Sequence, residues 1–362
     1  MKYEDIFTFV NLIKAHRKVR RSKLHKNEVV EFELNKSHEL YKLYEELNRK
    51  TYQISPYRTF YIYEPKKRRV DATPYRDRVV QNCFVDNYLF PLLENRLIYD
   101  NAACRKKKGT DFARNRLKAF LLDAYKKYGL NFYVLTFDIH HYFESINHNI
   151  MKDKIRKIIK NKEILEFVLM VIDSFNKDTN VGVPLGNQTS QCFALYYLDN
   201  FDRVIKEKYR IKYYTRYMDD GVILSNDKAL LTRLNSELKE VIRKLALSFN
   251  GDKNNIYPIK QGIAYLGFTY SLTSTGKVVV KMSRKKKKRL IRHLNHHKLY
   301  KDSLVSYRNY LKKRSSNYRL IHKLSKTIKS NGIILVMCLG KGLIQSIKAK
   351  SNKAHLVVGL FS

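Results

Sequence analysis

Alternating apolar and polar positions indicate two strands that flank a pair of adjacent carboxylates. Residues 213–217 and 221–224 are rich in β-branched and aromatic side chains, and Asp219 and Asp220 stand between them. The pattern predicts a hairpin with the acid pair at an exposed turn, because a buried strand accommodates adjacent acids poorly. The two carboxylates need a counter-charge, which water or a hard divalent cation such as Mg²⁺ supplies. An ordinary acidic turn fits the same local pattern.

Another strand ends in a carboxylate closer to the N-terminus. Residues 132–138 are a continuous apolar run that finishes at Asp138, which is the pattern of a buried strand. If this strand and the hairpin are antiparallel neighbours, Asp138, Asp219 and Asp220 converge at one end of a sheet. Three hard oxygen donors in one place suit two Mg²⁺ ions and a triphosphate. Taken alone, Asp138 fits a strand-terminal turn equally well.

The rest of the chain carries the periodicity of amphipathic helices and of further short strands. The pattern predicts helices over these segments: 4–19, 28–49, 74–97, 110–128, two within 148–176, one that follows a turn over 182–191 and reaches about 207, and one from 227 to about 249. A strand, a turn and a strand are expected over 57–70, and short strands over 255–281. Both helices and strands are therefore expected along the chain.

Composition and charge narrow the class of partner. At 362 residues, with 44% hydrophobic residues and 27 tyrosines, the chain can fold around a sizeable core. Its formal net charge is +39, from 72 Lys and Arg against 33 Asp and Glu. Self-repulsion of that size favours a polyanionic partner, nucleic acid above all. No apolar run approaches the roughly 20 residues that span a bilayer, so no membrane partner is expected.

The N-terminus and the cysteines indicate an intracellular setting. Glu4 and Asp5 stand where a signal peptide would be apolar, which predicts a cytoplasmic protein. The 4 cysteines are scattered without a Cys-x-x-Cys pair. They are expected to be reduced and mostly buried, and to form neither a zinc site nor disulfides.

Several motifs, taken in order, resemble those of reverse transcriptases. The motifs that match the family's palm are Phe137-Asp138-Ile139 with Tyr142-Phe143 and Ile146; Gly182, Pro184 and Gly186 with Ser190-Gln191; Tyr217-Met218-Asp219-Asp220; Asn250-Gly251-Asp252-Lys253; and Tyr265-Leu266-Gly267-Phe268. Segments 76–81 and 103–110 resemble parts of the family's fingers. The similarity covers about 55–325, which an isolated acidic turn does not explain.

The resemblance implies an RNA-directed DNA polymerase with an α+β, right-hand polymerase fold. Its parts would be N-terminal helices and fingers at 1–130, a palm of antiparallel sheet plus helices with part of the fingers at 131–281, a helical thumb at 282–330, and a tail of unknown role at 331–362. The implied partners are an RNA template, an RNA or DNA primer and dNTPs, and the implied cofactors are two Mg²⁺ ions. A small basic accessory protein or a structured noncoding RNA is a further partner that the resemblance allows.

The resemblance also implies roles for single residues. The metal-binding positions would be Asp138, Ile139, Asp219 and Asp220, with the three aspartates catalytic. Phe143 takes the place of the family's steric gate, whose aromatic edge clashes with a ribose 2′-hydroxyl; simple core packing is the alternative. The other expected substrate contacts are Leu185, Gly186, Gln191, Arg68 and Arg69.

Basic side chains are expected to handle the triphosphate. Arg68 and Arg69, or the neighbouring Lys66 and Lys67, are candidates to hold it, as planar forks or point charges, although a solvated hairpin tip fits them too. Lys253 matches a family lysine that is a candidate general acid for the departing pyrophosphate. An ordinary surface lysine is the alternative for Lys253.

The glycine turn bears on the subtype. Leu185 precedes Gly186, and Ser190-Gln191 follows, where the commonest family pattern has Gln and Ser-Pro. This combination resembles the reverse transcriptases of diversity-generating retroelements, and antiphage-defence relatives have similar palms. An aliphatic side chain in place of an amide removes hydrogen-bond control over the incoming nucleotide, so error-prone copying is expected.

A group II intron maturase fits less well, since no added maturase or endonuclease segment is evident. A catalytically decayed RNA-binding protein remains the alternative from another class, although all three carboxylates are present.

Overall fold

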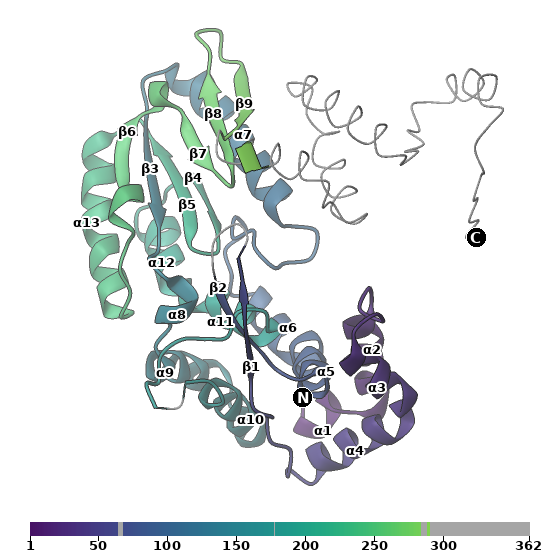
Figure 1. Ribbon diagram of the computed structural model, residues 1–362. Coiled ribbons are helices and arrows are strands. Elements are labelled where there is room, and N and C mark those ends of the chain that lie inside the picture. Colours follow the sequence, from purple (N-terminus) through teal and green to yellow (C-terminus); the bar gives the residue numbers. More distant parts are fainter. Residues whose placement is uncertain (64–67, 177, 284–287, 290–362) are drawn as a thin grey trace, which may run out of the picture. The chain divides into compact units, whose positions relative to one another are not determined.

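An antiparallel four-stranded sheet, ordered β4-β5-β3-β6, carries the core of the computed structural model (Figure 1). Its strands are β3 (Tyr133–Asp138), β4 (Tyr213–Tyr217), β5 (Asp220–Ser225) and β6 (Asn255–Pro258). The structure describes residues 1–63, 68–176, 178–283 and 288–289. Met1–Val280 forms one compact unit. The expected strand that ends at Asp138 and the expected hairpin are therefore both present, as antiparallel neighbours.

Some of the expected features lie outside the described residues. They are Lys66 and Lys67, Cys338, the tail at 331–362 and, apart from a few residues at its start, the thumb at 282–330.

The register of the sheet sorts its side chains onto two faces. Phe137 of β3 lies opposite Gly221 of β5, and Gly221 lies opposite Arg216 of β4. In the next row Asp138 lies opposite Asp220. Because successive side chains of a strand point to opposite faces, these two rows belong to different faces. One face presents carboxylates at its end, and the other carries Phe137 and Arg216.

Helix α13 (Lys228–Lys244) packs on the sheet. The face that carries Phe137 and Arg216 also contacts α11 (Gln188–Tyr197) through Leu195 and α12 (Asp199–Arg203) through Phe201. The Phe137 ring packs edge-on against Phe201 of α12, with 5.1 Å between the ring centroids. Gly221 leaves room for that ring, since a Cβ at this position would lie 2.2 Å from Phe137 Cζ. Glycine beside the carboxylate pair is thus a packing requirement. It lets an aromatic ring fill the space under the strand.

The carboxylate face packs in part against helix α7 and a small sheet. These elements are α7 (Thr110–Tyr128), β7 (Ile263–Tyr265), β8 (Phe268–Leu272) and β9 (Val278–Met282). Phe120 of α7 packs on Tyr213 of β4 at 5.7 Å between ring centroids. Arg114 of α7 donates a hydrogen bond to the Leu266 carbonyl in the β7–β8 turn, at 3.1 Å. Helix α7 thereby ties the small sheet to the central one (Figure 1).

The N-terminal part is a group of helices packed around α5, followed by a hairpin. Its elements are α1 (Tyr3–Ile6), α2 (Phe9–Arg20), α3 (Asn27–Leu34), α4 (Lys36–Asn48), β1 (Arg58–Ile62), β2 (Arg68–Ala72), α5 (Tyr75–Phe84), η1 (Val85–Leu89) and α6 (Phe90–Glu94). Buried His16 joins α2, α3 and α5. Its Nε2 lies 2.8 Å from Glu33 Oε2 and its Nδ1 lies 3.0 Å from the Tyr75 hydroxyl.

The remaining α-helices and a second π-helical segment lie between β3 and β4 along the chain. They are α8 (Tyr142–Ser145), α9 (His148–Ile158), α10 (Lys162–Asp173) and the π-helical segment η2 (Val204–Lys208) that continues α12. Within the described ranges, no helix is long and apolar enough to cross a membrane.

Several predicted helices have different bounds in the structure. The helix expected over 74–97 contains the π-helical segment η1, in which the Phe90 amide donates to the Val85 carbonyl, and it ends at Glu94. Pro91 explains the wider turn, since a proline ring crowds the carbonyl four residues earlier. The helix predicted from 227 to about 249 ends at Lys244, because the chain turns at Ala246 with a φ of 55°.

Other differences are breaks within three of the predicted helices and the exposure of one cysteine. The single helices expected over 4–19, over 28–49 and from the 182–191 turn to about 207 are each divided, and the last already begins at Gln188. Cys83 and Cys192 are buried free thiols, as expected, whereas Cys104 is exposed.

Candidate active site

Three aspartates from separate parts of the chain meet at the end of the central sheet. Asp138 is the last residue of β3 and pairs with Asp220, the first residue of β5. Side chains of directly opposed residues on one face lie roughly 5 Å apart at Cβ. Asp219 occupies the turn before β5, and its carbonyl accepts a hydrogen bond from the Ile139 amide at 3.2 Å. The pairing of β3 with β5 thus brings together the carboxylates that the sequence separates.

The turn between β4 and β5 holds two residues, Met218 and Asp219. Met218 has a φ of 56°, the positive value that primed hairpin turns require and that side chains other than glycine adopt at a cost. The expectation of an exposed acid pair is wrong. Asp219 and Asp220 are both partly buried, and Asp220 already belongs to the strand. The β7–β8 turn and the neighbouring strand β3 account for this burial, since both contact the start of β5.

Burial and mutual repulsion make these aspartates hard to ionise. Burial is the largest cause, and the charge of Asp138 is the next, of a rise in the pKa of Asp219 to about 6 and of Asp220 to about 7. The Lys253 ammonium lowers both pKa values, without offsetting the rise. A hydrogen bond from the Leu266 backbone also lowers the pKa of Asp220. The cluster therefore lacks positive charge, and a cation would stabilise it.

Among the described residues, Lys253 is the basic side chain that forms an ion pair with the cluster. Its Nζ lies 2.9 Å from Asp138 Oδ2. Asn250 holds the same aspartate, since its amide donates to the Asp138 carbonyl at 2.8 Å and its Nδ2 to Asp138 Oδ2 at 3.3 Å. The Asn250 side chain also caps the 3₁₀ turn Gly251–Lys253, which presents the lysine. The expected general acid thus lies at the carboxylates, half-exposed and paired with one of them.

The three carboxylates are of the chemical type that binds hard divalent ions, although they are not yet arranged as a coordination site. Carboxylate oxygens are the ligands that Mg²⁺ prefers, and the raised pKa values indicate uncompensated negative charge. Among the residues that the structure describes, no three His, Cys, Asp or Glu side chains already form a ligand set. An ion at Asp138 Oδ2 would compete with Lys253, which already pairs with that oxygen. Ile139 has a buried side chain, so only its backbone could contact an ion.

The glycine turn lies beside the segment that follows β3. The Val183 amide donates to the Phe143 carbonyl at 2.8 Å, and the Gly182 amide donates to the Ile146 carbonyl at the same distance. Phe143, on α8, is half-buried and packs in part on the core. The expected gate residue and the segment that leads to Leu185 are thereby joined through the backbone.

The expected platform residues differ in exposure. Leu185 and Gln191 are half-buried, and Gly186 is exposed. Gly186 has a φ of 105°, and a Cβ there would meet nothing within 4 Å. The backbone conformation, rather than space, is what requires glycine at this position. Gln191 lies in the first turn of α11, where its amide donates to the Asn187 carbonyl at 3.3 Å.

The expected triphosphate contacts lie on the hairpin formed by β1 and β2. Arg68 and Arg69 are exposed on β2. Arg69 Nε donates to Asp71 Oδ1 at 3.0 Å, and Thr59 donates to the same oxygen at 2.6 Å. Within the described part of the chain, Arg68 has no such partner. Arg69 thus braces the hairpin, which leaves Arg68 as the more available of the two.

Sequence reasoning missed a buried ion pair behind the turn. Arg216 Nη2 lies 2.6 Å from Asp202 Oδ2, and both side chains are almost fully buried, at 0% and 1% exposed. Strand alternation places Arg216 on the helix-covered face, where a charged residue requires a partner. That signal could have indicated a buried pair. It could not have named Asp202 as the partner.

In the metal-free protein, Asp220→Asn is expected to raise stability at neutral pH. The folded-state pKa of about 7 lies above the ordinary value of 3.8. Between these values the folded chain binds more protons than the unfolded chain, so native stability falls as pH rises from about 4 to about 7. The variant escapes this loss, and should be more stable by roughly 1–3 kcal/mol at pH 8, with the gap narrowing toward pH 5.

Urea denaturation in EDTA at pH 5 and pH 8 measures the difference. Asp252→Asn, which removes an exposed acid of the neighbouring 3₁₀ turn, is the control and should change little. An Asp220→Asn gap that does not grow with pH would contradict the account of the cluster.

Comparison with known proteins agrees with this geometry. Residues 63–270 match the model of the family described as reverse transcriptase (RNA-dependent DNA polymerase). A Saccharomyces cerevisiae protein named for intron 2 of COX1/OXI3 is 24% identical over 398 residues, covering 86% of this chain and 44% of that protein. The chain thus spans less than half the length of this curated relative.

Solved telomerase structures are similar at low identity. Apo telomerase from Candida tropicalis, truncated from its C-terminal domain, is 15% identical with a TM-score of 0.48, covering 64% of this chain and 56% of that one. Telomerase from Candida albicans, in complex with the TWJ fragment of telomeric RNA, is 11% identical with a TM-score of 0.48, covering 71% and 54%. The mixed helices and antiparallel sheets agree with the expected α+β, right-hand polymerase fold. Because the family match extends over more than half of the 362 residues, the chain belongs to the reverse transcriptase (RNA-dependent DNA polymerase) family.

Proposed function

We propose that the chain copies RNA into DNA by nucleotidyl transfer at the three aspartates. The observation that carries the proposal is the register that sets Asp138 opposite Asp220, with Asp219 in the adjoining turn. In the reaction, the primer 3′-oxygen attacks the α-phosphorus of a dNTP and the bond to the pyrophosphate oxygen breaks. Two Mg²⁺ ions, held by these aspartates and the Ile139 backbone, would activate the 3′-hydroxyl and neutralise the triphosphate.

The basic side chains have separate tasks in this proposal. Arg68, with Arg69 beside it, holds the triphosphate from the β1–β2 hairpin. Lys253 donates a proton to the departing pyrophosphate, and its position 2.9 Å from Asp138 keeps it at the reacting groups. Gly186 and Gln191 form the floor of the nucleotide site.

The division into parts follows the same reasoning. We assign 1–130 to N-terminal helices and fingers, 131–281 to the palm with part of the fingers, 282–330 to the thumb and 331–362 to a tail. The net charge of +39 supports nucleic acid as the partner, because a template–primer duplex neutralises it. The basic stretch 17–26 runs from the last turn of α2 through the connection to α3. In this proposal it contacts the phosphates of the duplex and of any structured noncoding RNA.

The first test is primer extension on an RNA template with dNTPs and Mg²⁺. The native chain should extend the primer, and Asp219→Asn should lower the rate by at least about 1,000-fold, since the variant loses a charge at the reacting phosphate. Asp227→Asn, at the exposed cap of α13, is the matched control and should retain activity.

Two outcomes would contradict the proposal. A native chain that binds the template–primer but never extends it would indicate an RNA-binding module without polymerase activity. Extension by Asp219→Asn at the native rate would place the chemistry elsewhere.

The selectivity for deoxynucleotides is proposed to depend on Phe143. Its half-buried ring packs on the core and its backbone carbonyl accepts a hydrogen bond from the glycine turn, so a ribose 2′-hydroxyl would meet an edge held by the core. Phe143→Val should raise the kcat/KM for rNTPs roughly 10–100-fold relative to dNTPs. Phe9→Val, at a half-buried site in α2, should not alter the ratio. Unchanged discrimination in single-nucleotide incorporation would assign Phe143 to packing alone.

We further propose error-prone copying in a diversity-generating retroelement. The supporting feature is Leu185, an apolar side chain where the commonest pattern of the family has a glutamine whose amide could form hydrogen bonds. Leu185→Gln should therefore lower the misincorporation frequency several-fold, whereas the apolar replacement Leu185→Met should not. Sequencing of the extension products measures both. Equal error frequencies in the native and Leu185→Gln chains would contradict this role, and an antiphage-defence enzyme would then be equally compatible.

A second candidate is an intron-encoded reverse transcriptase. The likeness to the yeast protein named for a COX1/OXI3 intron extends over 86% of this chain and favours it. Preferential binding to a folded intron RNA over an unstructured RNA of equal length would support this alternative.

A further inference from the structure

We infer that Arg216 is a positioning residue that holds the turn carrying Asp219 and Asp220, acting from the helix-covered face of the sheet. The inference deepens the proposed function and rests on it for its kinetic consequence. Arg216 is not within the carboxylate row, so it acts through the turn and not on the substrate.

The guanidinium forms hydrogen bonds in several directions at once. Arg216 Nε donates to Asp202 Oδ1 at 2.8 Å and Nη2 to Asp202 Oδ2 at 2.6 Å, which is a bidentate pair. Nη1 donates to the Met218 carbonyl at 2.7 Å, and Nη2 also reaches the Leu195 carbonyl at 3.3 Å. One side chain therefore joins the catalytic turn to α11 and α12.

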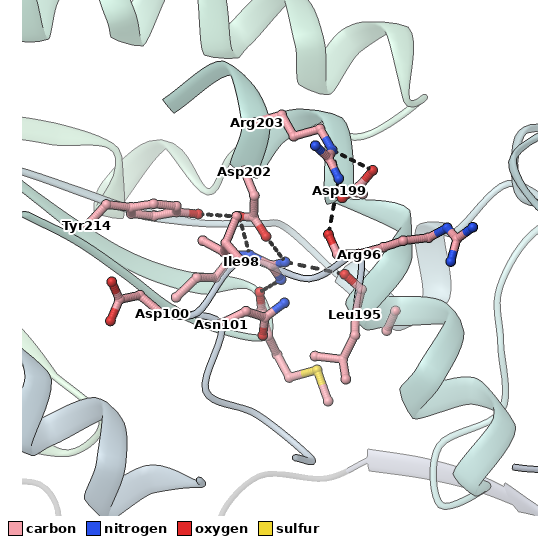
Figure 2. Close-up of polar contacts among 12 residues, drawn as sticks. Arg96, Ile98, Asp100, Asn101, Leu195, Asp199, Asp202, Arg203 and Tyr214 are labelled. Atoms are coloured by element: carbon pink, nitrogen blue, oxygen red, sulfur yellow. Dashed lines mark hydrogen bonds and ion pairs between the residues drawn. The ribbon is translucent and has the colours of Figure 1, made fainter. Parts of the chain in front are cut away.

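The partner that holds Arg216 is itself fixed. Asp202 accepts a further hydrogen bond from the Tyr214 hydroxyl at 2.6 Å, and Tyr214 lies on β4 two residues before Arg216 (Figure 2). Burial lowers the pKa of Arg216, but the Asp202 carboxylate more than compensates, so the pKa is raised overall and the guanidinium stays charged. The ion pair is thus charged and buried, and Tyr214 holds its aspartate in place.

The backbone of Arg216 is held as well. Its amide donates to the Asp100 carbonyl at 3.2 Å, and its carbonyl accepts from the Ala102 amide at 2.9 Å. These bonds fix the open edge of β4. With the backbone and the guanidinium both immobile, the Met218 carbonyl two residues later has a rigid donor to bind.

The turn needs this support because two effects work against it. Met218 adopts a positive φ, and the adjacent carboxylates repel Asp138. A buried charge-assisted hydrogen bond is about twice as strong as a neutral one, which makes the Arg216–Met218 contact an effective restraint. Lysine could not reproduce it, since a single ammonium lacks the planar fork that spans Asp202 and Met218.

Arg203 supplies a natural comparison, because it lies on α12, the helix that also carries Asp202. It pairs with Asp199 at 3.2 Å and with Glu207 at 2.7 Å, and it donates to the Arg96 carbonyl at 3.3 Å. Figure 2 shows this pair beside Asp202, with no dashed line to the hairpin. Arg203 is therefore an arginine of α12 in an ion pair of its own that does not hold the turn.

The test replaces the whole pair so that no buried charge is left alone. Removing Arg216 singly would leave Asp202 unpaired, at a cost that threatens folding, whereas replacing both partners of a buried pair is often tolerated. The main variant is Arg216→Met with Asp202→Asn, in which the new amide oxygen still accepts from Tyr214. Arg216→Lys is the second variant, and Arg203→Met is the matched control.

The readouts separate positioning from general stability. In metal-free protein, hydrogen exchange at the Ile139 amide, which donates to Asp219, reports on the turn. It should be about tenfold faster in the double variant, as expected for the loss of one hydrogen bond at the turn. In primer extension, kcat should fall about 100-fold while KM for dNTP changes little, because misplaced catalytic groups slow the reaction without weakening ground-state binding. Arg216→Lys should give smaller changes, and Arg203→Met none.

The two arms distinguish the possible failures. If Ile139 exchange or kcat in the double variant equals that of Arg203→Met, the positioning role is wrong. If the double variant does not fold, Arg216→Lys decides by the same readouts. An inactive native chain would overturn the proposed function, while the exchange measurement would still decide whether Arg216 holds the turn.

Discussion

Electrostatic repulsion among partly buried carboxylates is the constraint on which the rest of the structure depends. The fold places Asp138, Asp219 and Asp220 together in a setting where burial alone disfavours their charge. Among the described residues, the charge of Lys253, that of Arg216 near Asp219, and backbone hydrogen bonds at the strand ends counter this repulsion. The site is therefore less stable without cations than the scaffold around it. The folded chain loses stability at this cluster because the proposed function requires negative charges close together, as is common in active sites.

The two faces of the central sheet have different roles: one carries the carboxylates, and the other carries the residues that support the strands. The carboxylate face ends in acids, and the opposite face buries Phe137 against α12 and the Arg216–Asp202 pair under the same turn. Gly221 makes this possible, since a side chain there would displace the ring. The acids can be exposed to substrate on one side because the strand that carries them is held from the other.

Much of this arrangement could be predicted from the sequence, for reasons that are local. The strand that ends at Asp138 and the hairpin around Asp219 have clear apolar patterns, and the order of the motifs indicated that they are neighbours. The pairing of Arg216 with Asp202 could not be predicted, because contacts between a strand and a preceding helix follow no sequence period. The burial of the acid pair was missed for a related reason. It depends on the β7–β8 turn, which is far away in the chain and packs beside β5 only in the folded protein.

The most direct test of the central claim is the structure of the chain bound to template–primer, an incoming dNTP and Mn²⁺, with the ions located by anomalous scattering. The account predicts metal density between Asp138 and the Asp219–Asp220 pair, with Lys253 displaced from Asp138 toward the triphosphate. Ions bound away from Asp138 and Asp220, with a dNTP seated elsewhere, would contradict it.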